Sequence, residues 1–348
     1  MRILHVIAGA PVGGAETFAR DAILSLHARG ITQAVLTRPW PGLLEGYADA
    51  GIAAHAMRFG AIDRVLRHKN RIAALARAIG ADLVHAWMSR ANSFIPAAMP
   101  CPVLGWFGDY YDLKYFRRTD CYAGVTPDIA AYLRRLGTPP ERTFMVNTFG
   151  TMPPAPKIAR ASLNTHEDAT VLLVLARMHA VKGIDTMLRA LAELPGMVLW
   201  LAGEGPARAE YETLARSLGV ADRTRFLGWR RDRRALLEAC DICVLPSRYE
   251  PFGTVIVEAW AMRRPLVATL ADGARQYVTD GQTGLLCPID DPPALAAQLR
   301  RLAADPALAA RLAEAGAAAY QADFTREIVT DRLLDCYRTC IALGPRTR

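Results

Sequence analysis

Two glutamates, Glu250 and Glu258, lie eight residues apart beside apolar sequence, where a carboxylate needs a polar partner. The apolar run 241–246 predicts a buried strand, and the prolines and glycine after it predict a loop. The mostly apolar residues 254–262 predict a short buried helix with Glu258 one turn beyond its start. Glu250 precedes the helix N-terminus, whose free N–H groups attract anions such as phosphate. The backbone N–H groups could bind phosphate, and the two glutamates could accept hydrogen bonds from sugar hydroxyl groups. This combination fits a nucleotide sugar.

The spacing alone leaves a second interpretation open, in which Glu258 is paired with an arginine elsewhere and Glu250 is a solvated loop residue. The stretch from Ser247 to Trp260 resembles the E-x7-E motif of the retaining glycosyltransferases of family 4, which have the GT-B fold. The resemblance implies that Glu250 contacts the transferred sugar. It also implies that Glu258 holds the ribose hydroxyls of the donor.

Two cations, Arg177 and Lys182, follow the apolar run 171–176. Arginine can bind a phosphate through two N–H groups and lysine as a point charge, so the pair could clamp a diphosphate. Two solvated surface charges are the alternative. The stretch 176–185 is similar to the family signature G-R-x4-K-G-x-D, with Ala176 in place of the first glycine. The resemblance implies that both cations neutralise the leaving diphosphate, which is the main catalytic demand.

Glycines follow three other predicted strands. Gly13 and Gly14 open the first predicted helix, where the missing side chain lets a ligand approach the backbone, although a plain tight turn is the alternative. Gly203 and Gly228 lie in loops that resemble the family segments near the nucleotide base. The donor-binding residues that the resemblance implies are Gly13, Gly14, Arg177, Lys182, Gly203, Gly228, Glu250, Phe252, Gly253, Thr254, Val255 and Glu258.

The N-terminal half departs further from the family pattern. Many members carry a histidine after the strand predicted here at 102–106, and Phe107 stands in its place. We expect Asp109 to take over that role by orienting an acceptor hydroxyl, with a turn or helix-cap aspartate as the alternative. His85 lies in the predicted strand 82–87, where the family often has a histidine at a strand end, and the resemblance implies a catalytic role for it. A satisfied structural histidine is the alternative.

Strands and helices alternate in both halves of the chain, which predicts two doubly wound, mainly parallel sheets. The Pro-rich stretch 151–168 predicts a linker. We therefore expect an α/β protein with the GT-B fold and two Rossmann-like domains. Residues 1–155 would bind the acceptor and residues 169–324 the nucleotide sugar, with a cleft between them. The resemblance implies that a last helix, within 325–348, returns to the N-terminal domain.

Composition argues against several classes of protein. The chain has 348 residues, 52% of them hydrophobic, but no apolar run approaches the 18 residues of a membrane span. His5 interrupts the short apolar N-terminal run, which predicts a first strand and a cytoplasmic protein. The seven cysteines are scattered, and Cys240-x-x-Cys243 has no second pair, so buried thiols are expected. Neither a metal-ligand cluster nor a nucleic-acid motif is evident, so we expect no metal cofactor and no nucleic-acid partner.

The formal net charge of +8 comes from the first half of the chain, where residues 1–160 hold 19 Lys and Arg against 11 Asp and Glu. The excess is concentrated in 58–77, and apolar residues at helical spacing predict a basic amphipathic helix over 62–79. Such a helix suits peripheral contact with an anionic membrane or an anionic acceptor, with a solvated helix face as the alternative.

These features predict a retaining glycosyltransferase that moves a hexose-type sugar from a UDP- or GDP-type donor to a hydroxyl group. The resemblance favours an envelope glycan or glycolipid acceptor, in the assembly of lipopolysaccharide, capsule or exopolysaccharide at the inner face of the cell membrane. A soluble small-molecule acceptor, a GT-B epimerase or phosphorylase, and a non-catalytic GT-B partner subunit are the alternatives.

Overall fold

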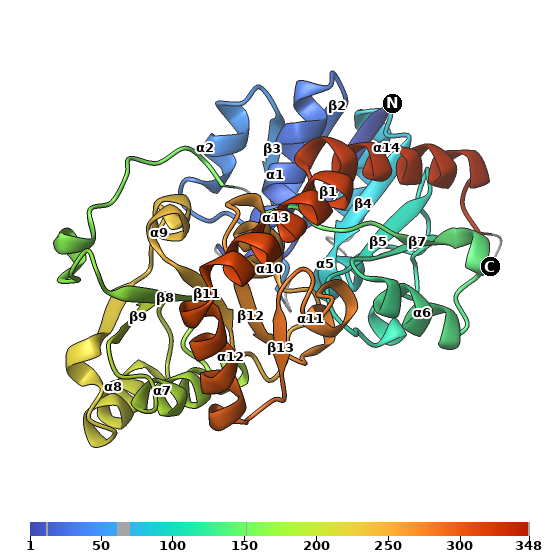
Figure 1. Ribbon diagram of the computed structural model, residues 1–348. Coiled ribbons are helices and arrows are strands. Elements are labelled where there is room, and N and C mark those ends of the chain that lie inside the picture. Colours follow the sequence, from blue (N-terminus) through green and yellow to red (C-terminus); the bar gives the residue numbers. More distant parts are fainter. Residues whose placement is uncertain (12, 61–69, 151, 347–348) are drawn as a thin grey trace. The chain divides into compact units, whose positions relative to one another are not determined.

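The computed structural model describes residues 1–11, 13–60, 70–150 and 152–346. The chain divides into two compact units (Figure 1). Unit 1 comprises Met1–Thr148 and Arg326–Arg348, and unit 2 comprises Phe149–Thr325. The N-terminal domain was predicted to end at residue 155, and the first segment of unit 1 ends at Thr148. The C-terminal domain was predicted to end at residue 324, and unit 2 ends at Thr325.

Unit 1 is built on a parallel sheet in the order β3-β2-β1-β4-β5-β6-β7. In the register of β1 and β4, Ile3 lies opposite Leu83 and Ile7 opposite Trp87. The central strands are almost wholly buried because helices cover both faces of the sheet. The strands are β1 Arg2–Ile7, β2 Thr32–Thr37, β3 Ala53–Ala56, β4 Leu83–Trp87, β5 Val103–Phe107, β6 Cys121–Gly124 and β7 Thr143–Met145.

The last helix of the chain, α14 (Arg326–Leu343), belongs to unit 1 (Figure 1). It buries Val329, Leu333 and Tyr337, and the hydroxyl of Thr330 is hydrogen-bonded to that of Ser25 on α1 at 2.8 Å. The other helices of unit 1 are α1 Gly14–Ala28, α2 Leu43–Ala48, α4 Asn70–Ala78, α5 Met88–Asn92 and α6 Pro127–Arg135.

Unit 2 is built on a second parallel sheet, in the order β10-β9-β8-β11-β12-β13. Its strands are β8 Thr170–Leu175, β9 Met197–Ala202, β10 Thr224–Gly228, β11 Ile242–Leu245, β12 Leu266–Thr269 and β13 Leu285–Cys287. Because the strands are parallel, their carboxyl ends lie along one side of the sheet, which we call the carboxyl edge of unit 2. Ligands of doubly wound sheets bind at this side.

Helices cover both faces of the unit 2 sheet, with α7, α8 and α12 on one side and α9 and α10 on the other (Figure 1). Asp291 and Asp305 cap α12 and α13 by accepting hydrogen bonds from the N–H groups of Ala294 and Leu308, both at 2.9 Å. The helices are α7 Ile184–Ala192, α8 Arg208–Ser217, α9 Arg233–Ala239, α10 Thr254–Ala261, α11 Asp272–Tyr277, α12 Pro292–Ala304 and α13 Pro306–Asp323.

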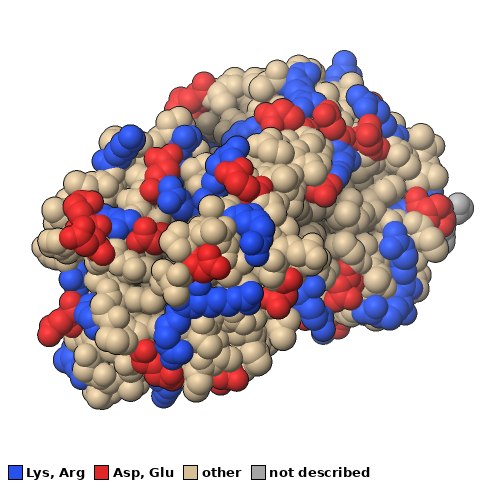
Figure 2. Space-filling model, in the orientation of Figure 1, with Lys and Arg blue, Asp and Glu red and all other residues tan. Residues whose placement is uncertain are grey.

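The predicted basic helix over 62–79 is described only from Asn70, where α4 begins. Residues 61–69, which carry Arg64, Arg67 and Lys69, lie outside the described part of the chain. Within α4, Arg71 and Arg77 are exposed and Ile72 is buried, which fits an amphipathic helix. On the face shown in Figure 2, basic and acidic side chains are interspersed.

Two further findings bear on the composition. No helix in the described ranges combines the length and apolar character needed to cross a membrane. All seven cysteines lie in described residues, and each is a buried free thiol.

Candidate active site

The predicted donor residues of unit 2 follow the carboxyl ends of its strands. Arg177 and Lys182 follow β8, and Glu250 follows β11. Glu258 lies in the second turn of α10, which starts at Thr254 as predicted. The segments after β8 and β11 share one edge because the sheet is parallel.

Lys182 and Glu250 form an ion pair, with the Lys182 ammonium donating to Oε2 of Glu250 at 2.6 Å. The side chains are 21% and 16% exposed, respectively. The hydroxyl of Ser247 donates to the same carboxylate oxygen at 3.3 Å. The pair brings a cation and a hydrogen-bond acceptor together, which is what the anomeric end of a sugar diphosphate requires.

Gly183 allows the Lys182 loop to pack closely on the Glu250 loop. Its φ of 61° lies in the left-handed region, and a Cβ atom here would overlap the carbonyl oxygen of Pro246. Any L side chain would therefore suffer both backbone strain and a steric clash.

We expect Gly183→Ala to lower the free energy of unfolding by about 2–4 kcal/mol and to weaken the Lys182–Glu250 contact. Chemical denaturation measures this loss. Gly196→Ala is a matched control for the backbone term, because Gly196 also has a positive φ, of 82°, but open space at its Cβ. An equal loss in the two variants would show that the contact with Pro246 is unimportant.

Glu258 is buried, with its side chain 2% exposed. Arg233, at the start of α9, donates to its Oε1 at 2.6 Å, whereas its Oε2 is buried without a hydrogen-bond partner in the described chain. Burial raises the pKa of Glu258 from 4.5 to about 7, although the charge and the hydrogen bond of Arg233 lower it. The alternative with an arginine partner for Glu258 is thus confirmed, whereas its role in holding ribose stays a prediction.

The backbone of Gly150 packs against Cγ and the backbone of Glu258. A Cβ atom at Gly150 would lie 2.7 Å from Cγ of Glu258, which leaves no room for a side chain. The chain thus packs backbone against the aliphatic part of the glutamate, and the orientation of the carboxylate is fixed by packing as well as by Arg233.

Arg177 differs from Lys182 in its lack of a side-chain partner among the described residues. Its side chain is exposed, and within the described residues it forms neither a hydrogen bond nor an ion pair. An uncommitted guanidinium at the carboxyl edge can take an anionic ligand without first breaking a protein contact.

The loops of Gly203 and Gly228 are joined, since the N–H of Gly203 donates to the carbonyl of Gly228 at 2.8 Å. A Cβ atom at Gly228 would lie 3.1 Å from a carboxylate oxygen of Glu204, which in turn pairs with Arg208 on α8. The ends of β9 and β10 thus form one backbone-lined corner of the carboxyl edge.

The aromatic ring of Phe252 belongs to the core of unit 2. It packs edge-on against Tyr277 and Phe324, with ring centroids 5.2 and 6.1 Å away. A donor could therefore meet Phe252 only through its backbone. Thr254 and Val255 form the first turn of α10 after Gly253, and their N–H groups are the ones that a helix leaves free.

The predicted residues of unit 1 lie in separate loops. Gly13 precedes α1 and Gly14 is its first residue, and the carboxylate of Glu16 accepts from the N–H of Ala10 at 3.0 Å. Asp109 follows β5 and accepts from the N–H of Tyr110 at 2.7 Å, as a turn aspartate does. The ligand roles of Gly13, Gly14 and Asp109 stay predictions.

His85 lies in a structural environment, with its Nε2 buried and without a hydrogen-bond partner in the described chain, and its predicted catalytic role stays a prediction. His85 is the middle residue of β4 and is 0% exposed. Its Nδ1 is hydrogen-bonded to the hydroxyl of Tyr337 at 2.6 Å, and its ring stacks on Trp87. Burial, together with the nearby His5, holds the pKa of His85 well below its ordinary value. The hydrogen bond to Tyr337 joins the sheet of unit 1 to α14.

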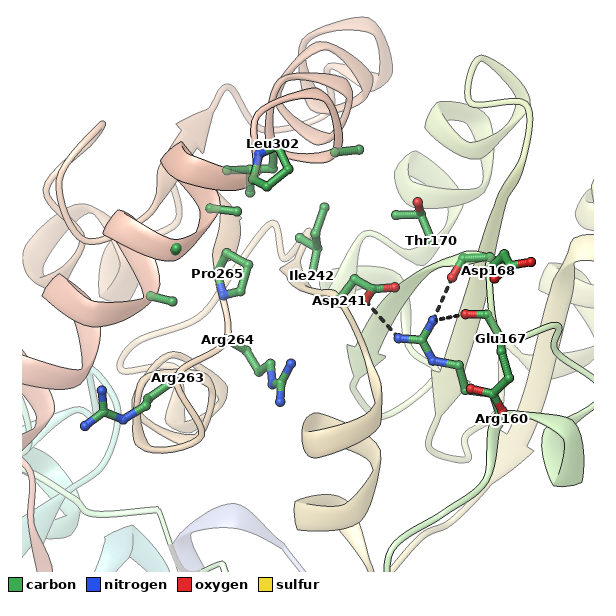
Figure 3. A pocket seen from close by; sticks show the side chains of 16 residues that line it. Arg160, Glu167, Asp168, Thr170, Asp241, Ile242, Arg263, Arg264, Pro265 and Leu302 are labelled. Atoms are coloured by element: carbon green, nitrogen blue, oxygen red, sulfur yellow. Dashed lines mark hydrogen bonds and ion pairs between the residues drawn. The ribbon is translucent and has the colours of Figure 1, made fainter.

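A cavity of about 440 Å3 lies at the opposite edge of the unit 2 sheet, among the residues that precede β8, β11 and β12 (Figure 3). Its arginines already have structural partners. Arg160 pairs with Asp241 at 2.8 Å and donates to the carbonyl of Ala239, and Arg264 donates to the carbonyls of Glu238 and Cys240. These contacts satisfy the C-terminus of α9, so the cavity is separate from the predicted donor residues.

Sequence analysis missed two arginines of the site. Arg233 contacts Glu258 across 25 residues of sequence, and no motif marks it. Arg248 joins Asp185 to Asp290. Asp185, the aspartate of the K-G-x-D signature, could have pointed to Arg248, because a carboxylate close to the core needs a charged or polar partner. In the described ranges, no group of three or more His, Cys, Asp or Glu side chains could hold a metal ion.

Comparison with known proteins identifies the class. Residues 157–319 match the family described as Glycosyl transferases group 1, and residues 12–149 match the family described as Glycosyltransferase Family 4. The lipopolysaccharide core biosynthesis glycosyltransferase LpsE of Rhizobium meliloti (strain 1021) is 36% identical over 96% of this chain and 98% of the relative. LpsD of the same strain is 35% identical over 98% of this chain and 99% of the relative.

Solved structures agree on the fold. HepE of Anabaena, crystallised with UDP, has a TM-score of 0.82 at 20% identity and covers 97% of this chain and 100% of its own. WaaG, a glycosyltransferase involved in lipopolysaccharide biosynthesis, has a TM-score of 0.74 at 20% identity, over 96% and 99%. The protein is thus a glycosyltransferase with the GT-B fold, as predicted. The chain belongs to glycosyltransferase family 4.

Proposed function

We propose that this glycosyltransferase transfers a hexose-type sugar, with retention of anomeric configuration, from a nucleoside diphosphate sugar of the UDP or GDP type. The observation that carries the proposal is the buried Oε2 of Glu258, which has no partner in the described chain. It lies on α10, whose N-terminus follows the loop that holds the Lys182–Glu250 pair. A ribose hydroxyl would satisfy that oxygen while the diphosphate meets the cations.

The charges of the donor fit those of the site. Arg177 would bind the diphosphate first because its side chain forms no ion pair with the described residues that it would have to break. Lys182 would then exchange its contact with Glu250 for a phosphate oxygen, which frees Glu250 to accept hydrogen bonds from the sugar hydroxyls. Together with the first N–H groups of α10, these two cations would stabilise the leaving diphosphate without a metal ion.

In the proposed reaction, the acceptor hydroxyl attacks the anomeric carbon from the face that the diphosphate leaves. The bond from the anomeric carbon to the phosphate oxygen breaks, and the bond to the acceptor oxygen forms on the same face. The departing phosphate oxygen takes the proton of the acceptor. Asp109 of unit 1 would orient the acceptor.

The acceptor class is proposed from the relatives, two of which are named for the lipopolysaccharide core. We propose an envelope glycan or glycolipid acceptor. The basic segment 58–77 would support peripheral contact with an anionic membrane surface, where a lipid-linked acceptor is presented.

Thermal melting with UDP, GDP, ADP and CMP, each at millimolar concentration, tests the donor site. We expect either UDP or GDP to raise the melting temperature, since a ligand at about 100 times its Kd stabilises by roughly 2.7 kcal/mol. The shift should vanish in Glu258→Ala. It should persist in Glu238→Ala, because Glu238 pairs with Arg234 on the outside of α9.

The same experiment can overturn the proposal. If no nucleotide shifts the melting temperature, the donor site is wrongly assigned. If a nucleotide binds but none of its sugars is turned over, the protein is a non-catalytic partner subunit. With an active sugar donor, NMR of the product settles retention, because an inverted anomeric configuration would contradict the mechanism.

A further inference from the structure

Arg248 joins three loops at the carboxyl edge of unit 2. Its two terminal nitrogens donate to the two carboxylate oxygens of Asp185, at 2.8 and 2.7 Å. Its Nε contacts the carboxylate of Asp290 at 2.6 Å, and one terminal nitrogen also donates to the carbonyl of Ala180 at 2.5 Å. These partners follow β8 and β13, whereas Arg248 itself follows β11.

Backbone hydrogen bonds reinforce this connection. The N–H of Arg248 donates to the carbonyl of Val181 at 2.8 Å, and the N–H of Tyr249 reaches the same carbonyl at 3.3 Å. The hydroxyl of Thr186 donates to Asp290 at 3.1 Å. The loops after β8 and β11 are therefore held together by main chain and side chain at once.

The charges in this cluster are matched. Burial raises the pKa of Asp185, but the hydrogen bonds and the charge of Arg248 outweigh it and hold that pKa below its ordinary value. Asp290 has a φ of 57°, in the left-handed region that aspartate and asparagine adopt more readily than other residues except glycine. In this conformation the Asp290 carboxylate lies against Nε of Arg248, so the cluster holds two carboxylates on one guanidinium.

The cluster adjoins the reacting groups. Lys182 directly follows Val181, whose carbonyl accepts from the Arg248 backbone, and Glu250 lies two residues after Arg248. The Lys182–Glu250 distance of 2.6 Å is thus fixed between two loops that Arg248 binds together. If the Arg248 side chain lost these contacts, the loop that carries Lys182 would shift relative to the loop that carries Glu250.

We propose that Arg248 is a positioning residue, which sets the placement of Lys182 against Glu250 through its bidentate pair with Asp185 and its contact with Asp290. This inference rests on the proposed function, because it assigns Lys182 and Glu250 to the transferred sugar and its diphosphate. It concerns catalysis rather than donor affinity, since Arg248 itself is committed to protein partners.

The test is Arg248→Lys, assayed by release of nucleoside diphosphate from the nucleotide sugar that the melting screen selects. Lysine keeps the charge but cannot make the forked contacts, so the loops should shift. We expect kcat to fall about 10- to 100-fold and the donor KM to change less than about threefold, because misplacing reacting groups by about 1 Å can slow a reaction about 100-fold. Arg189→Lys is the matched control, since Arg189 contacts the same Asp185 only from the exposed side, at 3.5 Å.

A double-mutant cycle separates positioning from general destabilisation. If Arg248 acts through Glu250, the effects of Arg248→Lys and Glu250→Gln on kcat should not add, and Arg248→Lys should cost little once Glu250 has been changed. Additive effects would overturn the inference. Asp290→Asn provides a second variant, because asparagine tolerates the left-handed conformation while removing the charge that Nε contacts, and we expect about a threefold loss of kcat from it.

The outcomes also separate this inference from the function on which it rests. A wild-type protein that neither binds a nucleotide nor turns over a nucleotide sugar refutes both. An active wild-type protein whose kcat survives both Arg248→Lys and Asp290→Asn refutes the positioning role alone.

Discussion

Replacing Arg177 with methionine is expected to lower kcat about 1,000-fold and to leave the melting temperature of the unliganded protein nearly unchanged. In the proposed mechanism Arg177 meets the charge that grows on the leaving diphosphate, and cations in this role contribute roughly 10³-fold or more to phosphate-transfer rates. The fold should tolerate the change because the side chain is exposed and has no ion pair in the described chain. Steady-state kinetics and thermal melting on one preparation measure both effects.

Arg311→Met is the matched control, because Arg311 is also exposed but lies on α13, away from the carboxyl edge. It should leave kcat unchanged. Substitution of Lys182 would be harder to interpret, because it would leave the Glu250 carboxylate, which is only 16% exposed, without its ion-pair partner. An Arg177→Met enzyme within about tenfold of wild type would mean that the diphosphate lies elsewhere or is neutralised by other groups.

The part of the fold that sequence predicted is the part with strong hydrophobic patterning. The mostly apolar segments that form β1, β4, β8 and β11 are buried on both faces, and their runs of apolar residues predict strands. The strand β3 (Ala53–Ala56) was missed because it lies at the sheet edge, largely exposed, and has no alternation to detect. The three-residue β7 is too short to leave a pattern.

At the site, sequence motifs located the residues that follow strands but not the partners that control them. The Lys182–Glu250 pair joins two motifs that the sequence had shown separately, and nothing in their spacing of 68 residues predicts a contact. The partner of His85 illustrates the same limit. Its place in a strand could be predicted from local sequence, but its hydrogen bond to Tyr337, 252 residues later, could not. Contacts between distant segments depend on topology, which local patterns do not encode.

The burial of Glu258 makes the unliganded protein less stable than it could be. An ionised carboxylate with one oxygen unpartnered is unfavourable in the interior, as the pKa of about 7 reflects. Binding sites often retain such unfavourable groups because a ligand satisfies them, and removing the group then stabilises the fold at the expense of function.

Glu258→Gln is therefore expected to raise the melting temperature of unit 2 at pH 8 by several degrees and to leave it almost unchanged at pH 5. The pKa of Glu258 rises from 4.5 in the unfolded chain to about 7 in the folded protein. Between these values the folded protein holds a proton that the unfolded chain has released, so wild-type stability falls as the pH rises through this window. The loss is about 3 kcal/mol once the pH exceeds 7, and glutamine, which does not ionise, escapes it.

The same variant should bind its nucleotide about 100-fold more weakly at pH 8, because it loses a charged acceptor for the ribose hydroxyls. Wild-type affinity should fall below pH 7, where Glu258 becomes protonated, whereas the weak affinity of Glu258→Gln should not depend on pH in this range. Glu238→Gln, on the exposed side of α9, is the control and should change neither property. A Glu258→Gln protein that is less stable than wild type at both pH values would show that the Arg233 pair outweighs the burial of the charge, and that Glu258 is chiefly a structural residue.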